Sequence, residues 1–334
     1  MTPDAPPAEA AASGEKFRSC PSILTNMAFW QSRLWMRHAH SIYDLQPGHE
    51  PEPFSPLMEA IRLFRRRKRY EVVVTMGART SLYYGLLCAA AGVDARQVMC
   101  EVFLDPERGG WRYRFKTALY RLVARRSLGI LTNSSMEVAA VQRRYRLSAD
   151  RVMYVPMHTN IRDPHETGTD EGFVLSAGRT WRDYPTLLAA LRGLASVRAI
   201  IICGRRDLRG ASLPSGVEIR REVPRDVYLD LLRRCRLVAV PLLPVERATG
   251  QVVVLEAMAL AKPVVATRTS GTLDLVVDGR TGILVPPRDP DALRSAVARL
   301  LADRDLARRM GRAGLDRVLR EFTIETHAAQ ARRY

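Results

Sequence analysis

The sequence predicts an α/β fold of two Rossmann-like, doubly wound domains that face a cleft. Short apolar runs with the character of buried strands alternate with stretches of helical period, which is typical of parallel sheets. The alternation stops at a polar stretch, 161–172, and begins again at Phe173. A chain of 334 residues is long enough to bury two hydrophobic cores.

The composition shifts divide the chain into five parts. Residues 1–18 are rich in proline and alanine and are predicted to form a disordered tail. The first domain is expected over 19–160 and the linker over 161–172. The second domain is expected over 173–320, with a terminal segment over 321–334.

In the first domain, apolar strands are separated by helical stretches. We expect a short strand and then a helix within 19–46, and a glycine turn at the end of strand 71–77. The remaining strands are expected at 97–103, 129–135 and 151–156, and the helices at 57–70, 81–91, 111–126 and 136–146.

The second domain repeats this pattern. Its strands are expected at 173–177, 198–203, 217–223, 237–243 and 263–267, and its helices at 185–194, 226–234, 252–260, 290–301 and 305–320. The turn Ser270–Thr272 is expected to start a helix whose free N–H groups would suit an anion. A turn and a hairpin-like segment are expected over 278–288.

The net charge of +17 is the unusual feature of the composition. Such a charge attracts nucleotides, nucleic acid or an anionic membrane face. We exclude nucleic acid as a partner because the chain lacks aromatic-interleaved or helix-turn-helix patterns. Five scattered cysteines, the lack of a signal pattern and the lack of ~18 continuous apolar residues predict a cytoplasmic protein with reduced thiols.

The stretch from Ala248 onward contains the strongest candidate site. Thr249, Gly250 and Gln251 form a small, flexible loop before an apolar helix, and that helix carries Glu256. A carboxylate within such a helix either pairs with a cation for structure or faces a cleft.

LEAMALAKPVVAT over 255–267 and SGTLDLVVDGRTGILVPPRDPDAL over 270–293 closely resemble the donor-binding half of family 4 retaining GT-B glycosyltransferases. The resemblance implies that Glu256 binds the ribose of a nucleotide-sugar. It also implies that Thr249, Gly250, Gln251 and Val252 cradle the diphosphate and the sugar, and that 321–334 crosses back onto the first domain as a helix.

The resemblance also assigns Arg179 and Arg182, after strand 173–177, to the donor diphosphate. Fixed guanidinium groups stabilise the charge of a departing nucleoside diphosphate without a metal. The structural alternative is an exposed arginine pair at a strand end. Val223 lies where the family contacts the nucleobase through backbone, and a plain core valine is the alternative there.

Two positions depart from the family pattern. The second family glutamate, which touches the donor sugar, is replaced by Ala248, and Glu246 lies nearby but out of register. The family histidine after a mid-sheet strand of the first domain is also absent. Glu101 is the ionisable residue of that strand, and it is either a catalytic candidate at the cleft or a salt-bridged edge residue.

The resemblance implies a hexosyl- or related glycosyltransferase of bacterial glycan biosynthesis, which the arginine pair would allow to work without a metal. The donor would be a UDP- or GDP-sugar, with no other cofactor, and the resemblance implies retention. The acceptor is expected to be a lipid-linked glycan or a small molecule. The alternative is a non-catalytic nucleotide-sugar binder or assembly partner with a degenerate donor site.

Two basic stretches of the first domain suggest a peripheral location on the membrane. Residues 65–69 read RRRKR, and 111–126 is an amphipathic helix with Trp111 and Phe115 beside several arginines. This helix either docks on its domain with a solvated arginine face or lies in an anionic lipid surface.

Overall fold

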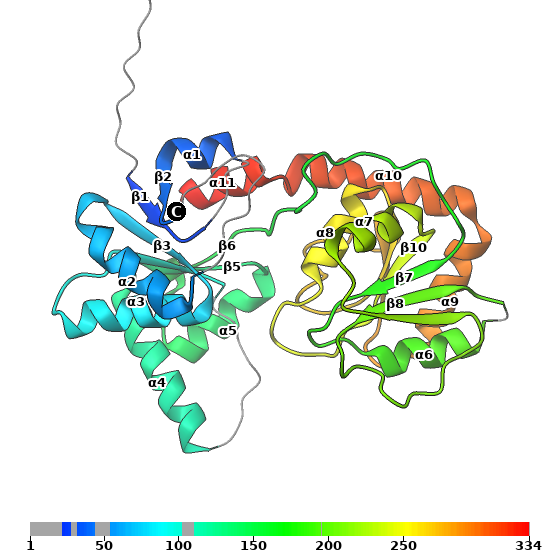
Figure 1. Cartoon of the computed structure of the whole chain (residues 1–334), viewed down its shortest axis with the longest axis horizontal. Helices are drawn as coiled ribbons and strands as arrows, with labels where there is room; N and C mark the ends of the chain where they lie inside the picture. The colour runs from blue at the N-terminus through cyan, green and yellow to red at the C-terminus, as the bar shows by residue number, and fades with distance from the viewer. Residues whose placement is uncertain (1–21, 28–31, 44–53, 102–109, 195, 334) are drawn as a thin grey trace, which may run out of the picture.

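The structure is a computed structural model that describes residues 22–27, 32–43, 54–101, 110–194 and 196–333. It contains two α/β lobes side by side (Figure 1). The N-lobe is built on a sheet between Ile23 and Tyr154, and the C-lobe on a sheet between Val174 and Val285. Each sheet has six strands and all pairings between them are parallel, which confirms the predicted fold class. The predicted tail, 1–18, lies outside the described residues.

The N-lobe sheet has the strand order β2-β1-β3-β4-β5-β6. Its strands are β1 Ile23–Thr25, β2 Ala39–Ser41, β3 Val72–Met76, β4 Gln97–Cys100, β5 Gly129–Thr132 and β6 Val152–Tyr154. The strand that follows β1 is added on one side of the sheet, and the strands that follow β3 are added on the other side. The switch point of this sheet therefore lies between β1 and β3.

Helices cover both faces of the N-lobe sheet. One face packs on α2 Pro56–Arg66, α3 Ala78–Ala90, α4 Trp111–Arg126 and α5 Ser135–Tyr145, and the other on α1 Arg33–His38 and α11 Ile324–Arg333. Capping side chains and a proline determine where two of these helices begin. The Ser55 hydroxyl accepts from the Met58 N–H at the start of α2, where Pro56 supplies the first helical residue. The Ser134 hydroxyl caps α5.

Three details of the N-lobe differ from the sequence prediction. Strand β2 was not expected, because three residues with an exposed histidine in the middle carry little strand signal. Helix α2 ends at Arg66 and is followed by a 3₁₀ turn, Arg67–Arg69. Strand β4 ends at Cys100, and the last residues of the predicted strand 97–103 lie outside the described ranges.

The C-lobe sheet has the order β12-β11-β10-β7-β8-β9. Its strands are β7 Val174–Ala177, β8 Ala199–Cys203, β9 Val217–Arg221, β10 Leu237–Val240, β11 Val264–Thr267 and β12 Gly282–Val285. Its helices are α6 Tyr184–Arg192, α7 Arg225–Arg234, α8 Gln251–Ala259, α9 Pro290–Ala302 and α10 Arg304–Glu321. This order is the doubly wound dinucleotide-binding arrangement, with its switch point between β7 and β10.

Two predictions for the C-lobe were wrong. The segment expected to be hairpin-like contains β12, an edge strand parallel to β11. Ser270–Thr272 forms a turn that does not continue as a helix, and the Thr272 hydroxyl lies within hydrogen-bond distance of the carbonyls of Thr267 and Thr269.

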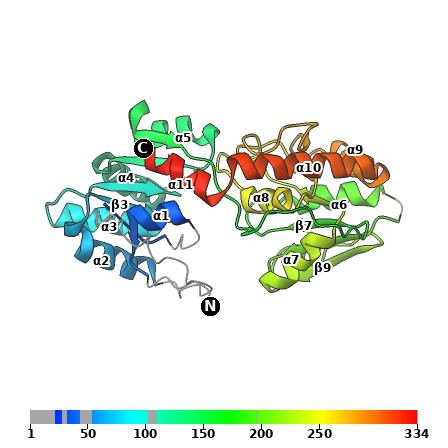
Figure 2. The same ribbon diagram turned by 90° about the horizontal axis from the view of Figure 1, so that it is seen from above.

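The chain crosses between the lobes twice (Figures 1 and 2). After β6 it passes through the linker into the C-lobe, and after α10 it returns as α11. The Glu325 carboxylate of α11 accepts hydrogen bonds from the Ser32 hydroxyl and the Arg33 N–H at the start of α1. None of the described helices is both long and apolar enough to cross a bilayer.

Candidate functional site

The C-lobe site is organised by the switch point between β7 and β10. Parallel strands that are extended in opposite directions leave a crevice at their carboxyl ends, where ligands of such sheets bind. The loop after β7 begins at Gly178, and the loop after β10 leads through Thr249 to α8. The two loops are joined across the switch point by an isolated bridge between Arg182 and Leu242.

Arg182 folds back over the end of β7. Its Nε donates to the Ala177 carbonyl at 2.9 Å and its Nη1 to the Thr180 carbonyl at 3.0 Å. Burial lowers the pKa of this guanidinium. Gly178 has φ +127°, and a Cβ there would lie 2.2 Å from Arg182 Nη2, so the glycine leaves room for the arginine. Within the described residues, no carboxylate pairs with Arg182, which leaves a half-buried positive charge at the switch point.

Arg179 is exposed at the same strand end. Its Cγ and Cδ lie against Gly204, where a Cβ would be 3.3 Å from each. Within the described part of the chain, its guanidinium makes no hydrogen bond or ion pair. The two predicted phosphate ligands therefore lie at the same end of the sheet, one half-buried and one exposed to solvent.

The predicted cradle residues lie at the start of α8. Gly250 is the N-cap, with φ +84°, and Thr249 is buried against the turn at Gly271. Gln251 reaches across to the N-lobe, where its Nε2 donates to the Asn133 carbonyl at 2.7 Å. Val252 is partly exposed. The cradle therefore lies directly at the junction of the lobes.

Glu256 lies inside α8 with 1% of its surface exposed. Its Oε1 accepts from Arg225 Nη2 at 2.7 Å, and its Oε2 accepts from the Tyr228 hydroxyl at 2.8 Å. Burial and the neighbouring carboxylate raise the pKa of Tyr228 well above its usual range. The structural pairing considered from the sequence is thus present. It does not exclude a ribose contact, because each carboxylate oxygen has a second lone pair.

Arg225 and Tyr228 are site residues that sequence reasoning missed. They lie 31 and 28 residues before Glu256, a separation that no local pattern reveals. Arg225 is half exposed and is the first residue of α7, two residues after Val223. Val223 is partly buried and packs against the C-lobe core. Arg225 therefore connects the segment of the predicted base contact with the predicted ribose contact.

Glu101 follows β4 at the edge of the N-lobe sheet that faces the C-lobe. It has φ +54°, a left-handed conformation that is costly for a residue with a side chain. Burial raises the pKa of Glu101, and the charge of Arg247, from the C-lobe loop after β10, opposes this rise. Glu101 also lines a cavity of about 760 Å³ over the face of the N-lobe sheet that carries α1 and α11.

Several interlobe contacts were not foreseen from the sequence. Asp274, in the turn after β11, accepts from the Ser134 hydroxyl, the Ser135 N–H and the Ser135 hydroxyl at 2.9, 2.8 and 2.6 Å. The Ala248 N–H donates to the Glu137 carboxylate at 2.8 Å. These contacts hold the start of α5 against the loops that carry the predicted cradle, so this conformation is closed on that side.

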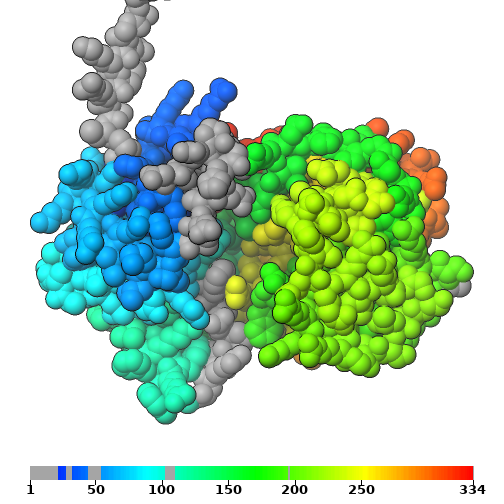
Figure 3. Space-filling model, in the orientation of Figure 1, coloured from blue at the N-terminus to red at the C-terminus, as the bar shows by residue number. Residues whose placement is uncertain are grey.

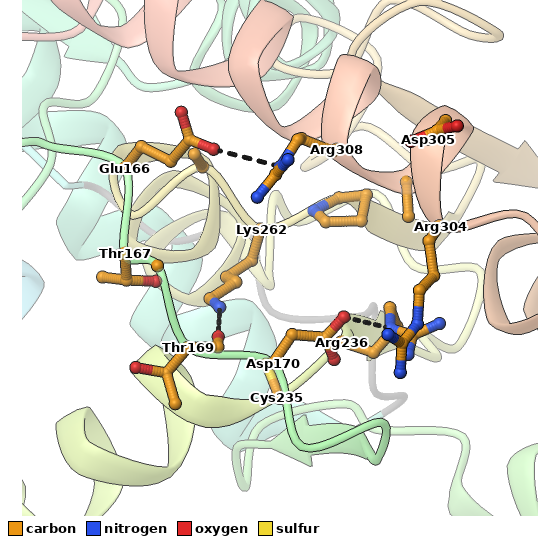
Figure 4. A pocket seen from close by; sticks show the side chains of 14 residues that line it. Glu166, Thr167, Thr169, Asp170, Cys235, Arg236, Lys262, Arg304, Asp305 and Arg308 are labelled. Atoms are coloured by element: carbon orange, nitrogen blue, oxygen red, sulfur yellow. Dashed lines mark hydrogen bonds and ion pairs between the residues drawn. The ribbon is translucent and has the colours of Figure 1, made fainter.

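A second pocket, of about 370 Å³, lies on the opposite edge of the C-lobe (Figure 4). There the buried Lys262 donates to the Thr169 carbonyl at 2.8 Å, and Arg236 pairs with Asp170 at 2.5 Å. These contacts bind the linker to the C-lobe. None of the predicted site residues lines this pocket.

Within the described ranges, no three His, Cys, Asp or Glu side chains gather as a metal site requires. Two parallel doubly wound lobes that face each other have the arrangement of the GT-B fold.

Comparison with known proteins agrees with this class. The family described as "Glycosyl transferases group 1" matches residues 172–303, and the family described as "Glycosyl transferase 4-like domain" matches residues 6–158. The chain belongs to these group 1, family 4-like glycosyltransferases of GT-B fold.

Individual relatives match over shorter stretches. A GDP-mannose-dependent alpha-(1-6)-phosphatidylinositol monomannoside mannosyltransferase of Mycolicibacterium smegmatis is 43% identical over 79 residues, which are 24% of this chain and 21% of that protein. The matched stretches of the curated relatives thus span less than a third of their own length.

Solved structures share the fold over most of the chain. Sucrose-phosphate synthase from Thermosynechococcus elongatus has a TM-score of 0.65 at 20% identity, covering 89% of this chain and 82% of that one. Anabaena HepE in complex with UDP and glucose has a TM-score of 0.67 at 16% identity, covering 93% and 98%.

Proposed function

We propose that this protein is a glycosyltransferase that moves a hexosyl or related sugar from a nucleotide-sugar to an acceptor. The observation that carries the proposal is the arginine pair at the C-lobe switch point. Arg182 is a half-buried cation without a carboxylate partner among the described residues, and Arg179 lies at the same strand end with its guanidinium in solvent. A nucleoside diphosphate would supply the missing negative charge.

These arginines would also stabilise the leaving group of the proposed reaction. When the bond between the sugar and the diphosphate breaks, negative charge grows on the departing phosphate oxygen. The Arg182 guanidinium, held in place by two backbone carbonyls, and the exposed Arg179 guanidinium would stabilise that charge. We therefore expect activity without a divalent metal ion or other cofactor. Retention of configuration at the sugar is part of the proposal and follows from the family resemblance.

The donor is expected to be a UDP- or GDP-sugar. Anabaena HepE, which shares the fold, is described in complex with UDP and glucose, and the Mycolicibacterium relative is named GDP-mannose-dependent. In the proposed site, Glu256 binds the ribose and the Val223 backbone lies at the base. Thr249, Gly250, Gln251 and Val252 cradle the diphosphate and sugar, and Glu101 faces the reacting centre from the N-lobe.

The acceptor is proposed to bind the N-lobe at a membrane surface. Helix α4 projects from the N-lobe (Figures 1 and 3) and exposes Trp111, Phe115 and Leu122 by 72%, 61% and 47%. These residues lie on one stripe of the helix and have basic neighbours, a combination that suits an anionic lipid surface. A lipid-linked acceptor on the cytoplasmic face of a membrane is consistent with this stripe.

A titration of UDP and GDP into Arg182→Ala, followed by calorimetry, tests the donor site. We expect nucleotide affinity to fall at least tenfold, because a charge-assisted hydrogen bond to phosphate is removed. Arg280→Ala is the matched control, since Arg280 is an exposed arginine of the C-lobe before β12, at the edge away from the cleft. Equal affinity in the two variants would exclude the proposed diphosphate site.

A second candidate is a non-catalytic nucleotide-sugar binder. It is favoured by Ala248, whose methyl side chain offers no polar contact to a donor sugar and whose N–H is already bound to Glu137. Slow hydrolysis of a UDP- or GDP-sugar by the purified protein, lost in Arg182→Ala, would rule out this candidate. Nucleotide binding without any hydrolysis or transfer would support it.

A further inference from the structure

A cationic cavity of about 780 Å³ lies in the N-lobe, at the end of the sheet that faces the C-lobe. Its floor is the turn after β3, from Gly77 to Thr80, at the switch point of the N-lobe sheet. Side chains of α4 and α5 form its walls, and Arg247 of the C-lobe loop closes one side. The cavity therefore borders the loop that leads into the predicted donor cradle.

The charge of the lining is one-sided. Arg79, Lys116, Arg144 and Arg247 all line the cavity, and none of the lining residues in the described part of the chain is acidic. Outside the lining, Glu246 pairs with Arg144 at 3.1 Å from a position 59% exposed, and the charge of Arg247 also acts on Glu101 and Glu137. Cations that converge from α3, α4, α5 and the C-lobe create a strongly positive potential for an anionic ligand.

The Tyr113 hydroxyl gives a second, independent indication of a ligand. Its oxygen is buried at the wall of this cavity, yet it has no hydrogen-bond partner within the described residues. A buried hydroxyl without a partner costs free energy unless a ligand or water satisfies it. Tyr83, Tyr120 and Tyr145 line the same space and offer ring faces of the kind that pack on sugar or cyclitol rings.

The floor adds backbone donors. Helix α3 has 13 residues and begins after Gly77, which has φ +88° and provides no side-chain cap. The Tyr120 hydroxyl fixes this turn by donating to the Ala78 carbonyl at 2.9 Å. The free N–H groups of the first turn and the exposed Arg79 therefore face the same cavity as the other cations.

We propose that this cavity binds the phosphate group of the acceptor, so that the acceptor is a phosphate-bearing polyol. The proposal rests on the proposed function, because it names the acceptor class of the same reaction. The phosphate would lie against Arg79 and the start of α3, and the polyol ring would lie among the tyrosines, toward the donor cradle.

Such a phosphate has two sources, a soluble sugar or polyol phosphate and the head group of a lipid. The geometry accommodates both. Tyr113, Lys116 and Thr117 of α4 face the cavity, while Trp111 and Phe115 of the same helix are exposed next to them. A membrane that contacts the exposed stripe would hold a lipid phosphate beside the cavity.

The test compares Arg79→Gln with Arg65→Gln in the full chain. Arg65 is an exposed arginine near the end of α2 and does not line the cavity, so it controls for the loss of one positive charge. Inorganic phosphate and glucose 1-phosphate are titrated by calorimetry with UDP at saturation, so that the diphosphate site is already filled. We expect Arg79→Gln to lose about tenfold or more in affinity, and Arg65→Gln to match the wild type.

A second arm distinguishes the sources by sedimentation with phosphatidylinositol-containing or pure phosphatidylcholine vesicles. Binding to the phosphatidylinositol vesicles that depends on Arg79 assigns the phosphate to a lipid, and binding to soluble phosphate alone assigns it to a soluble acceptor.

Phosphate affinity that is equal in the two variants, or absent in the wild type, would overturn the inference. The same titrations in Arg182→Ala separate this outcome from a failure of the proposed function. That variant should lose UDP and keep phosphate if the two sites are distinct.

Discussion

Asp274 is expected to act as an interlobe latch, and its removal should open the cleft. Its carboxylate lies in the C-lobe and accepts three hydrogen bonds from Ser134 and Ser135 at the start of α5, 139 to 140 residues away in sequence. The Ser134 hydroxyl also lies 2.6 Å from the Ser270 carbonyl, so its single hydrogen can serve only one of the two oxygens at a time. Asp274 thus acts as an additional cap of α5, supplied by the other lobe.

The magnitude follows from this geometry. Loss of a helix cap costs about 0.5–2 kcal/mol, and the two charge-assisted bonds from Ser135 are weakened because they are exposed to solvent. The Gln251–Asn133 and Ala248–Glu137 contacts remain in the variant. We therefore expect Asp274→Ala to weaken the closed state by about 1–2 kcal/mol, which is a factor of roughly 5–30 in the ratio of closed to open molecules.

Small-angle X-ray scattering measures this shift as an increase in the radius of gyration. Asp274→Asn is the matched variant, since it keeps the size of the side chain and loses its charge, and it should open the cleft less than Asp274→Ala. The urea midpoint should change little in either variant, because each lobe has a core of its own. An unchanged radius of gyration in Asp274→Ala would refute the latch, and a large loss of stability would show that Asp274 supports the fold instead.

Four further outcomes are expected. Gly178→Ala should displace the Arg182 guanidinium, because the new Cβ would lie 2.2 Å from its Nη2; kcat should fall in steady-state assays while the circular dichroism spectrum stays unchanged. Glu256→Ala should weaken nucleotide binding by about 1–3 kcal/mol in calorimetry and lower the Tm, because the buried Tyr228 hydroxyl loses its acceptor. Transfer should continue in EDTA, and a loss of activity that Mn²⁺ restores would contradict the arginine-based chemistry. Burial lowers the pKa of His327 from 6.5 to about 4. As the pH drops from 6.5 toward 4, the unfolded chain therefore binds a proton that the folded protein does not, and the stability should fall. Thermal melts of His327→Gln should show a shallower fall over this range.

Most of the fold could be predicted because most of its strands can be recognised from their own amino-acid sequence. Val72–Met76 and Val264–Thr267 are apolar runs buried in parallel sheets, and such runs stand out between polar turns. Ala39–Ser41 was missed because a three-residue strand is held by its neighbour β1, not by its own composition. The edge strand Gly282–Val285 was mistaken for part of a hairpin because a tight turn precedes it, while its pairing with β11 is set across the sheet.

The candidate site could be predicted only where one segment carries it. Arg179 and Arg182 were placed together correctly, since both follow β7, and Glu256 was placed in a helix next to its loop. Their ligand roles stay predictions. The partners of Glu256 could not be predicted from the sequence, because Arg225 and Tyr228 approach it only when α7 packs beside α8. The Asp274 contacts could not be predicted either, since they form between two lobes that have separate hydrophobic cores.

The two N-lobe helices that begin at the cleft edge differ in a way that bears on ligand choice. Helix α5 begins with the Ser134 hydroxyl at its first turn, and Asp274 adds a full negative charge from the other lobe. Helix α3 begins after Gly77 without a side-chain cap and has Arg79 in its first turn. In the closed state, the protein thus neutralises one helix start itself and leaves the other positive, beside three further cations. We therefore expect an anion that enters the cleft to be directed away from α5 and toward α3, so that closure of the lobes and the proposed selection of an anionic acceptor would both follow from the same charge arrangement.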